Sequence, residues 1–473
     1  MGMGCKVIKS MQRSFFRTGI LSLAVAFAVG CGSNNSGDAP KESGTGTEKS
    51  ATTLSVPMWT AKDLQSQTSL EVQSFKGGYD IDFFQKCAND YMKANPGVKI
   101  KLEGNPRVWE QLQPRMVSGD PPDLMFPGWG MDHWALAEEG QIFDLTEALK
   151  SPSADGKTPW GETFEPALLK LGQLEGVQVT LPYYMMIYGW WYDPAVFKAN
   201  GWTAPKTWKE FMELAPKIKA KGMAPLTFQG KYPYYLVYGM LLPWVQSIGG
   251  IEAVNACQNM EPGAWKSESV LKAAQMLEEI RDKGFFQEGA ISMTHTESQQ
   301  EFLNGKAAMV PCGTWLKSEM RNMMKPGARL AFMLPPSVEG GKGDPGAINV
   351  DIEPWMFPSK AKASDRAIDF FKYMTSLDNA KAFVKEKGTL MAIKGSNEGE
   401  LPEELVLPAK AFKESKTVWS IKFRHWYKGF MKELEDSLTA LLSKTLTSQQ
   451  FVERLEKAAQ AVREDESITK HKV

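Results

Sequence analysis

Apolar and polar positions along the first part of the chain predict short strands that alternate with amphipathic helices. Strands are predicted at residues 68–75 (TSLEVQSF), 98–104 (VKIKLEG) and 121–129 (PPDLMFPGW), with helices between them at residues 80–95 and 107–119. This order predicts an α/β fold with a parallel sheet and helices on both of its faces. Ligands bind such sheets beyond the carboxyl ends of the strands, so the loops after these strands are candidate site segments.

The middle and the end of the chain have a different pattern. Helices dominate from Pro205 to Thr296, where Thr207 is the expected cap of one helix and Ser267 or Ser269 the expected cap of another. Strands return at residues 307–313 (AAMVPCG), 329–337 (RLAFMLPPS) and 347–359 (AINVDIEPWMFPS), and amphipathic helices are predicted at residues 364–388 and 448–464.

The N-terminus has the order of an export signal. Four basic residues between Lys6 and Arg17 precede an uncharged run from Ile20 to Val29, which is too short to span a bilayer. Residues 28–31 (AVGC) resemble the lipobox of bacterial lipoproteins, with Ala28 where Leu is usual, which makes Cys31 the expected lipidation site. Ordinary signal cleavage, with Cys31 incidental, is the alternative.

The segment after Cys31 is rich in Gly, Ser, Thr and Asn. Such a segment cannot bury enough apolar surface to fold, so it is predicted to be a flexible tether. No later stretch has the length and apolar content of a transmembrane helix. The sequence therefore predicts an extracytoplasmic protein, in the periplasm or at the cell surface, that is held to the membrane only by a lipid anchor.

Charge and cysteine content narrow the function classes. Lys and Arg total 55 and Asp and Glu total 55, so the formal net charge is zero and nucleic acid is not an expected partner. The four histidines show no metal-binding spacing, and neither a metal nor another cofactor is expected. Apart from Cys5 and Cys31, the cysteines are Cys87, Cys257 and Cys312; a Cys257–Cys312 disulfide and three buried thiols are both compatible with the sequence.

No enzymatic motif stands out. The GxGxxG pattern of residues 341–346 precedes a strand and has Pro345 where a helix would begin, which makes it a turn and not a nucleotide site. GxSxG and HExxH are absent. A glycosidase needs two carboxylates about 5–10 Å apart, and the sequence singles out no such pair.

Tyr and Trp residues are concentrated between Leu181 and Trp202. A core seldom favours so many rings with polar tips, because each buried phenol OH or indole NH needs a hydrogen-bond partner. The negative face of such a ring suits the C–H face of a pyranose. Side chains alternate along an extended segment, so Trp190 and Trp191 cannot both face a cleft. We expect Tyr184, Met186 and Tyr188 near a cleft, with Trp190 and Tyr192 packed inward.

Three segments resemble landmarks of the extracellular solute-binding proteins, family 1, of carbohydrate ABC importers. They are residues 189–211 (GWWYDPAVFKANGWTAPKTWKEF), 301–320 (EFLNGKAAMVPCGTWLKSEM) and 352–376 (IEPWMFPSKAKASDRAIDFFKYMTS). The resemblance implies a two-lobed, type II periplasmic-binding-protein-like α/β fold with a hinge and an interlobe cleft. It also implies that the chain crosses between lobes near residues 183–187, 349–353 and 395–402.

The resulting domain prediction has four parts. Residues 1–30 are the lipoprotein signal peptide, 31–66 the tether, 67–184 plus 352–400 the first lobe, and 185–351 plus 401–473 the second lobe.

The resemblance implies a monomeric binding protein without enzymatic activity. It would capture a sugar or short oligosaccharide by lobe closure and deliver it to the permease subunits of an ABC importer. The aromatic-rich middle segment is similar to members that take up N-acetylglucosamine or chito-oligosaccharides. A secreted carbohydrate-active enzyme such as a glycosidase, or a surface glycan-binding protein without a transport role, are the alternatives.

The expected ligand-binding residues come from the loops after strands, the crossings and the C-terminal segment. They are Lys76, Tyr79, Arg107, Trp109, Trp129, Asp132, Tyr184, Met186, Tyr188, Tyr232, Tyr234, Trp315, Glu353, Trp355, Trp419 and Trp426. Trp129 and Trp315 are expected to be sugar platforms. Glu353 is expected to accept a hydrogen bond from a sugar hydroxyl, with a hinge salt bridge as its alternative role.

Overall fold

The computed structural model describes residues 55–473. The expected signal peptide, the lipidation site Cys31 and the tether up to residue 54 lie outside the described residues. Within residues 55–473, no helix combines the length and apolar character that a membrane crossing requires.

The expected tether reached residue 66, but its last part packs against the body. Trp59 is only 8% exposed, and its backbone N–H donates to the Asp144 carbonyl oxygen at 2.9 Å. Trp59, the one aromatic residue of this segment, therefore packs in the core. The polar residues around it led to the prediction of a flexible tether.

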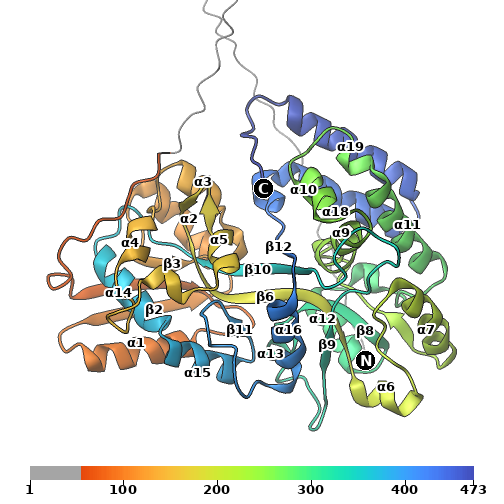
Figure 1. Ribbon diagram of the computed structural model, residues 1–473, viewed down its shortest axis with the longest axis horizontal. Helices are drawn as coiled ribbons and strands as arrows, with labels where there is room; N and C mark the ends of the chain where they lie inside the picture. The colour runs from red at the N-terminus through yellow and green to blue at the C-terminus, as the bar shows by residue number, and fades with distance from the viewer. Residues whose placement is uncertain (1–54) are drawn as a thin grey trace, which may run out of the picture. The chain divides into compact units, whose positions relative to one another are not determined.

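The first lobe is built on a three-stranded parallel sheet, as predicted. Its strands are β1 (Ser69–Phe75), β2 (Lys99–Asn105) and β3 (Leu124–Phe126), in the order β2-β1-β3. The connecting helices are α1 (Asp82–Ala94) and α2 (Val108–Ser118), and α14 (Ser364–Met374) and α15 (Leu377–Lys387) join them from later in the chain (Figure 1).

Helices cover both faces of this sheet. Leu124 and Phe126 of β3 belong to one apolar cluster with Phe83 of α1, whereas Met125 between them belongs to another with Leu112 of α2. The alternation of side chains along β3 thus divides the core in two, as a parallel sheet buried on both sides requires. The remaining elements of this lobe are η1 (Gly128–Gly130), α3 (His133–Glu138), α4 (Thr146–Lys150), η2 (Trp160–Thr163), α5 (Pro166–Leu171), β4 (Gln173–Leu174) and β5 (Val177–Gln178).

Two long strands connect the lobes. The strand β6 (Leu181–Tyr192) pairs antiparallel with β10 (Ile348–Trp355), and the two run side by side between the lobes in Figure 1. The first part of β6 also pairs with β11 (Leu390–Met391), and its last part pairs with β8 (Ala307–Gly313) and β9 (Ala331–Met333). Ile187 lies opposite Val350, so the residues expected at the first two crossings meet here.

The second lobe is mainly helical. Its elements up to residue 319 are α6 (Pro194–Asn200), α7 (Trp208–Ala220), β7 (Ala224–Leu226), α8 (Tyr234–Leu236), the π-helical turn η3 (Val237–Leu241), α9 (Leu242–Gly249), α10 (Ile251–Gln258), η4 (Ala264–Lys266), α11 (Glu268–Asp282), η5 (Ala290–Ser292), α12 (His295–Leu303) and α13 (Leu316–Glu319). The C-terminal elements are α16 (Glu403–Glu414), β12 (Val418–Trp419), α17 (Phe423–Trp426), α18 (Lys428–Leu442) and α19 (Ser448–Glu464).

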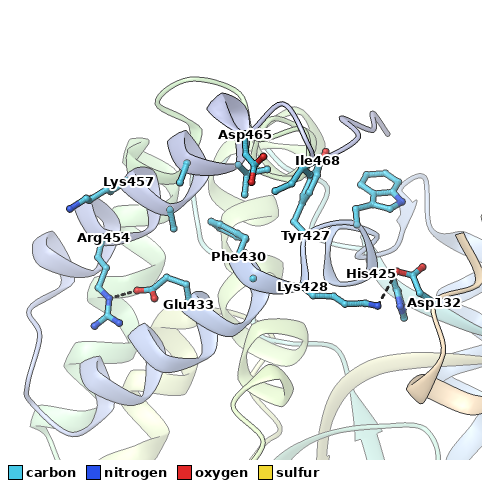
Figure 2. A pocket seen from close by; sticks show the side chains of 15 residues that line it. Asp132, His425, Tyr427, Lys428, Phe430, Glu433, Arg454, Lys457, Asp465 and Ile468 are labelled. Carbon is cyan, nitrogen blue, oxygen red and sulfur yellow. Dashed lines mark hydrogen bonds and ion pairs between the residues drawn. The ribbon is translucent and has the colours of Figure 1, made fainter. Parts of the chain in front are cut away.

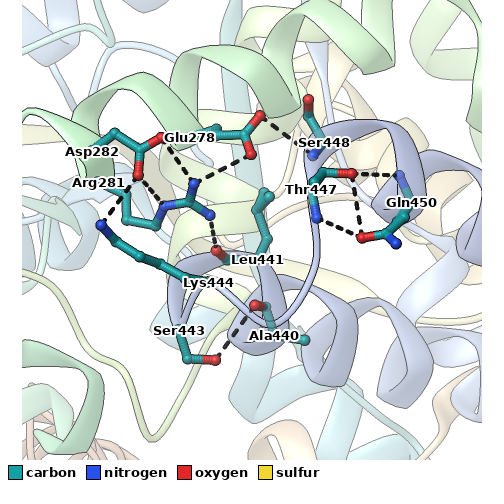
Figure 3. A network of polar contacts seen from close by, with 10 residues as sticks. All are labelled: Glu278, Arg281, Asp282, Ala440, Leu441, Ser443, Lys444, Thr447, Ser448 and Gln450. Carbon is teal, nitrogen blue, oxygen red and sulfur yellow. Dashed lines mark hydrogen bonds and ion pairs between the residues drawn. The ribbon is translucent and has the colours of Figure 1, made fainter.

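A polar network ties the C-terminal helices to this lobe (Figure 3). Arg281 of α11 donates to the Leu441 carbonyl oxygen near the end of α18 and forms ion pairs with Glu278 and Asp282. Lys444, in the turn after α18, reaches Asp282 at 3.4 Å. The guanidinium therefore satisfies a helix-terminal carbonyl and holds the α18–α19 turn against α11.

The local predictions for caps, turns and thiols have mixed outcomes. Thr207 caps α7 by accepting from Glu210 N, as expected, whereas Ser267 precedes α11 without a side-chain cap bond. The GxGxxG segment is a turn before β10. Cys87, Cys257 and Cys312 are free and buried, so the disulfide alternative is wrong in this structure.

Candidate functional site

A cavity of about 660 Å³ lies between the two lobes and receives side chains from both. Its volume is within the range typical of small-molecule sites. Ten of the expected ligand-binding residues line it, namely Lys76, Tyr79, Trp109, Tyr184, Met186, Tyr188, Tyr232, Tyr234, Trp315 and Glu353.

The first-lobe wall comes from the loops after β1 and β2. Phe75 ends β1 and packs against Trp109, with ring centroids 6.1 Å apart. At Gly77 an added Cβ would lie 2.4 Å from the Phe75 ring, so a side chain there would displace this wall. The cavity thus lies at the carboxyl ends of the parallel strands, where the sheet topology predicts a ligand site.

The strand β6 forms the floor through alternate residues. Tyr184, Met186 and Tyr188 line the cavity, near which they were expected. Trp190 and Trp191 are fully buried, and their indole N–H groups donate to the carbonyl oxygens of Gly239 and Gly313, each at 2.9 Å. Both indole N–H groups are hydrogen-bonded, so burial of these rings leaves neither donor unpaired.

Tyr192 at the end of β6 is half-buried and packs on Phe197, with centroids 4.7 Å apart. It therefore turns toward the second-lobe core, as expected.

The second-lobe wall is a cluster of rings. Trp315, just before α13, meets Tyr188 edge to face with centroids 5.3 Å apart and lies 6.1 Å from Tyr235. An added Cβ at Gly313 would come within 1.8 Å of the Trp315 ring, so the absence of a side chain at Gly313 lets the ring lie over the end of β8. Tyr232, 39% exposed, is at the mouth.

Charged groups complete this wall. The Arg424 guanidinium lies over the Tyr234 ring, 4.4 Å from its centroid, in a cation–π arrangement. His295 Nε2 is 3.3 Å from Glu319 Oε1, and Gln299 donates to Glu319 Oε2 at 2.8 Å. These partners hold the Glu319 carboxylate at the edge of the cavity.

Glu353 is the most deeply buried acid of the cavity. Its side chain is 3% exposed, and its Oε2 has no hydrogen-bond partner among residues 55–473. Burial raises the pKa of Glu353 to about 8, the nearby Tyr184 hydroxyl lowers it, and the charge of Asp351 raises it. Tyr79 also lines the cavity, and its buried hydroxyl is likewise unpaired within the described part of the chain.

Two expected site residues from the first lobe lie outside the cavity. Arg107 is exposed before α2 and pairs with Glu110 at 3.4 Å. Asp132 caps α3 by accepting from the N–H groups of Trp134 and Ala135. Both side chains interact with the first turn of the helix that follows them. Their position in loops after strands did not distinguish this role from ligand binding. Trp129 lies in η1, and its side chain is outside the described structure.

Three expected tryptophans are also placed elsewhere. Trp355 is fully buried in the first-lobe core, 5.2 Å from the Phe84 centroid, and Trp419 is 5% exposed in the second-lobe core. Trp426 stacks on His471 with centroids 5.0 Å apart. From this C-terminal segment the cavity lining contains Arg424 of α17, which was not expected there, and neither Trp419 nor Trp426.

Sequence reasoning missed Tyr235, His295, Glu319 and Arg424 as lining residues. His295 was expected to be a surface or satisfied residue, and its pairing with Glu319 fits the second description. No local signal marks Arg424, because its position depends on how the C-terminal helices fold back across the hinge.

A larger groove of about 900 Å³ runs along α18 and α19 (Figure 2). Phe430 and Val462 line its apolar part, while its charged residues pair with each other, Lys428 with Asp132 at 3.3 Å and Arg454 with Glu433. The groove also holds a buried unpaired N–H, that of Trp426, but apart from Asp132 its lining comes from the C-terminal segment. The interlobe cavity instead receives rings from both lobes, and we therefore take it as the candidate site.

Within residues 55–473, no group of three or more His, Cys, Asp or Glu side chains is arranged to hold a metal ion. The cavity offers a ligand aromatic ring faces, hydroxyl groups, basic and acidic side chains, and the buried carboxyl of Glu353.

Comparisons with known proteins agree with this architecture. The diacetylchitobiose binding protein NgcE of Streptomyces coelicolor is 27% identical over 473 residues, covering 98% of each chain. The multiple sugar-binding protein of Streptococcus mutans is 25% identical over 347 residues, covering 72% of this chain and 79% of the relative. The solved structure of a chitin oligosaccharide binding protein superposes with a TM-score of 0.70 at 23% identity, covering 84% of this chain and 99% of the other.

The fold is thus the two-lobed, type II periplasmic-binding-protein-like α/β fold with a hinge and an interlobe cleft, as expected. Residues 77–381 match the family model described as bacterial extracellular solute-binding protein. Because this match spans more than half of the chain, the protein belongs to the bacterial extracellular solute-binding protein family.

Proposed function

We propose that this protein captures a sugar or short oligosaccharide in the interlobe cavity and delivers it to an ABC importer. The observation that carries this proposal is the meeting of rings from both lobes, Phe75 and Trp109 from one and Tyr188, Tyr234 and Trp315 from the other. Aromatic pairs are worth roughly 0.5–1.5 kcal/mol beyond the area that they bury, and a ring on a sugar face is of similar scale.

The ligand class that we favour is N-acetylglucosamine or a chito-oligosaccharide. The support comes from the names of two similar proteins, a diacetylchitobiose binding protein and a chitin oligosaccharide binding protein. The unpaired polar atoms of Tyr79 and Glu353 offer hydrogen-bond partners to hydroxyl or acetamido groups.

Binding would act by closure of the lobes. A ligand that touches both walls stabilises the closed form through the contacts that exist only there. We place the first lobe at residues 67–184 plus 352–400 and the second at 185–351 plus 401–473. The Ser318 hydroxyl donates to the Gly78 carbonyl oxygen at 3.3 Å, which is the kind of contact that closure would form between them.

The remaining parts of the proposal concern location and partners. The protein would work as a monomer without a cofactor, anchored outside the cytoplasm through lipid on Cys31. The closed form would be recognised by permease subunits. Mass spectrometry of the membrane-extracted protein tests the anchor, because a lipidated Cys31 would be its first residue.

Isothermal titration calorimetry tests the binding function. The panel is N-acetylglucosamine, N,N′-diacetylchitobiose, maltose, xylobiose and a uronate disaccharide, and we expect micromolar or tighter binding of an N-acetylated sugar. A protein that binds none of them contradicts the proposal. Product analysis by chromatography separates the glycosidase alternative, since a binding protein returns the sugar unchanged.

A further inference from the structure

Glu353 occupies an irregular position on the hinge. Ile352 of β10 pairs with Met185, whereas Pro354 pairs with Pro182, so Glu353 lies opposite two residues of β6. The extra residue of this β-bulge is on β6, so β6 bends locally at Tyr183 and Tyr184. Tyr184 and Glu353, which meet at the bulge, both line the cavity.

The carboxyl is buried but incompletely paired. It is 3% exposed, and its Oε2 makes no hydrogen bond within residues 55–473. Buried polar atoms of native proteins are nearly always hydrogen-bonded, so an unpaired one that faces a cavity points to a missing partner. The neighbouring Tyr79 hydroxyl has the same property.

The surroundings of the carboxyl disfavour a negative charge. Asp351, two residues earlier on β10, is a second carboxyl nearby, and its charge interacts with Arg424 of α17. The other titratable and charged groups around this part of the cavity are Tyr184 on β6, Tyr79 and Lys76 after β1, Cys312 on β8, His295 on α12 and Glu319 on α13. Burial is the main reason that the pKa of Glu353 rises to about 8, so the carboxyl holds its proton at neutral pH.

We propose that Glu353 is a specificity-determining residue that binds ligand as a neutral acid, donating a hydrogen bond to an uncharged oxygen acceptor such as an acetamido carbonyl. The inference rests on the proposed sugar-binding function. It assigns Glu353 the opposite hydrogen-bonding role from the hydroxyl acceptor that the sequence predicted. A neutral donor loses its proton at high pH, so sugar affinity falls as Glu353 ionises, whereas an ionised acceptor would bind more tightly.

Calorimetry with N,N′-diacetylchitobiose between pH 7 and 9.5 tests the inference on the full chain. With a pKa of about 8, we expect the dissociation constant to rise about tenfold from pH 7 to pH 9, because only the protonated form binds. Titrations in buffers of different ionisation enthalpy should show that the protein takes up protons on binding above pH 8.

Two variants assign the effect to one carboxyl. Glu353→Gln keeps a donor that does not ionise, so its affinity, whatever its value at pH 7, should not fall with pH. Asp351→Asn, on the same strand, is the matched control; it removes a charge that raises the pKa of Glu353, so the fall should remain but begin at lower pH. Circular dichroism verifies that both variants fold, and a wild-type affinity that does not fall with pH contradicts the inference without either variant.

The outcomes are distinguishable. Wild-type affinity that is constant or rises with pH overturns the role of Glu353 while leaving sugar binding intact. A fall that persists in Glu353→Gln, or that disappears in Asp351→Asn, overturns it as well. A protein that binds no panel sugar at pH 7 overturns the proposed function and this inference with it.

Discussion

Hydrogen bonds at the polar tips help to explain why some aromatic residues are buried. Trp190 and Trp191 are fully buried because the carbonyl oxygens of Gly239 and Gly313 accept from their indole N–H groups. The Tyr79 hydroxyl has no such partner among the described residues, and its ring lines the cavity. Trp355, whose indole N–H is also unpaired among the described residues, lies in the first-lobe core, so an unpaired tip alone does not mark the site; the site is marked by rings from both lobes that line one cavity.

Trp315 should contribute directly to sugar affinity. We expect Trp315→Ala to weaken binding of N,N′-diacetylchitobiose by about tenfold or more, because the stacking surface and its burial are both lost. Trp202→Ala is the matched control, since Trp202 is also half-buried but packs on Phe197 away from the cavity. Calorimetry at pH 7 measures both; equal losses in the two variants would contradict the assignment.

Glu353 should also make the stability of the ligand-free protein depend on pH. Its folded pKa of about 8 is above its ordinary value of 4.5, so the folded state binds more protons than the unfolded state in this window. Stability from this group is then greatest below pH 4.5 and is lost as pH rises to 8. Urea unfolding at pH 5, 7 and 9 should show Glu353→Gln gaining stability over the wild type as pH rises; a constant difference would argue against the raised pKa.

Among the secondary-structure elements, segments with a clear local pattern were the most predictable. The predicted strand at residues 307–313 and the predicted helix at residues 448–464 have the bounds of β8 and α19. The strands predicted at residues 121–129 and 329–337 are shorter, as β3 and β9. Side-chain caps were less certain. Thr207 and Ser267 both stand before a helix, but only Thr207 makes the side-chain bond, since the cap also requires a suitable side-chain direction.

Thr207 and Ser267, the residues before α7 and α11, should differ in their effect on stability when each is replaced by Ala. Thr207→Ala should lower the free energy of unfolding by about 1 kcal/mol, because Glu210 N loses its partner. Ser267→Ala should have little effect or stabilise slightly, since the Ser267 hydroxyl is buried and unpaired among residues 55–473. Urea unfolding measures both, and a larger loss in Ser267→Ala would show that its hydroxyl has a role that the structure does not contain.

At the scale of the whole molecule, the long strands β6 and β10 set the distance between the lobes and carry the cavity floor. Residues of both lobes contribute ring faces to the cavity. In the proposed mechanism, a sugar that contacts both walls would favour the approach of the lobes.

Ligand-driven closure is testable in solution. Small-angle X-ray scattering should give a smaller radius of gyration with saturating N,N′-diacetylchitobiose than without it. The variant Trp315→Ala, at sugar concentrations that leave it unliganded, should keep the ligand-free radius. Binding with an unchanged radius in the wild type would instead favour the surface glycan-binding alternative.

The sequence by itself determined the alternation of strands and helices, the parallel sheet and the loops that follow it, because these depend on local periodicity and on short connections. Ten expected residues reach the cavity, several of them from these loops. Only the tertiary structure decided the direction of Trp355, which packs on Phe84, and the approach of Arg424 to Tyr234. Each depends on elements that are far apart in the chain and meet only in the folded protein, so no short stretch of sequence contains the signal.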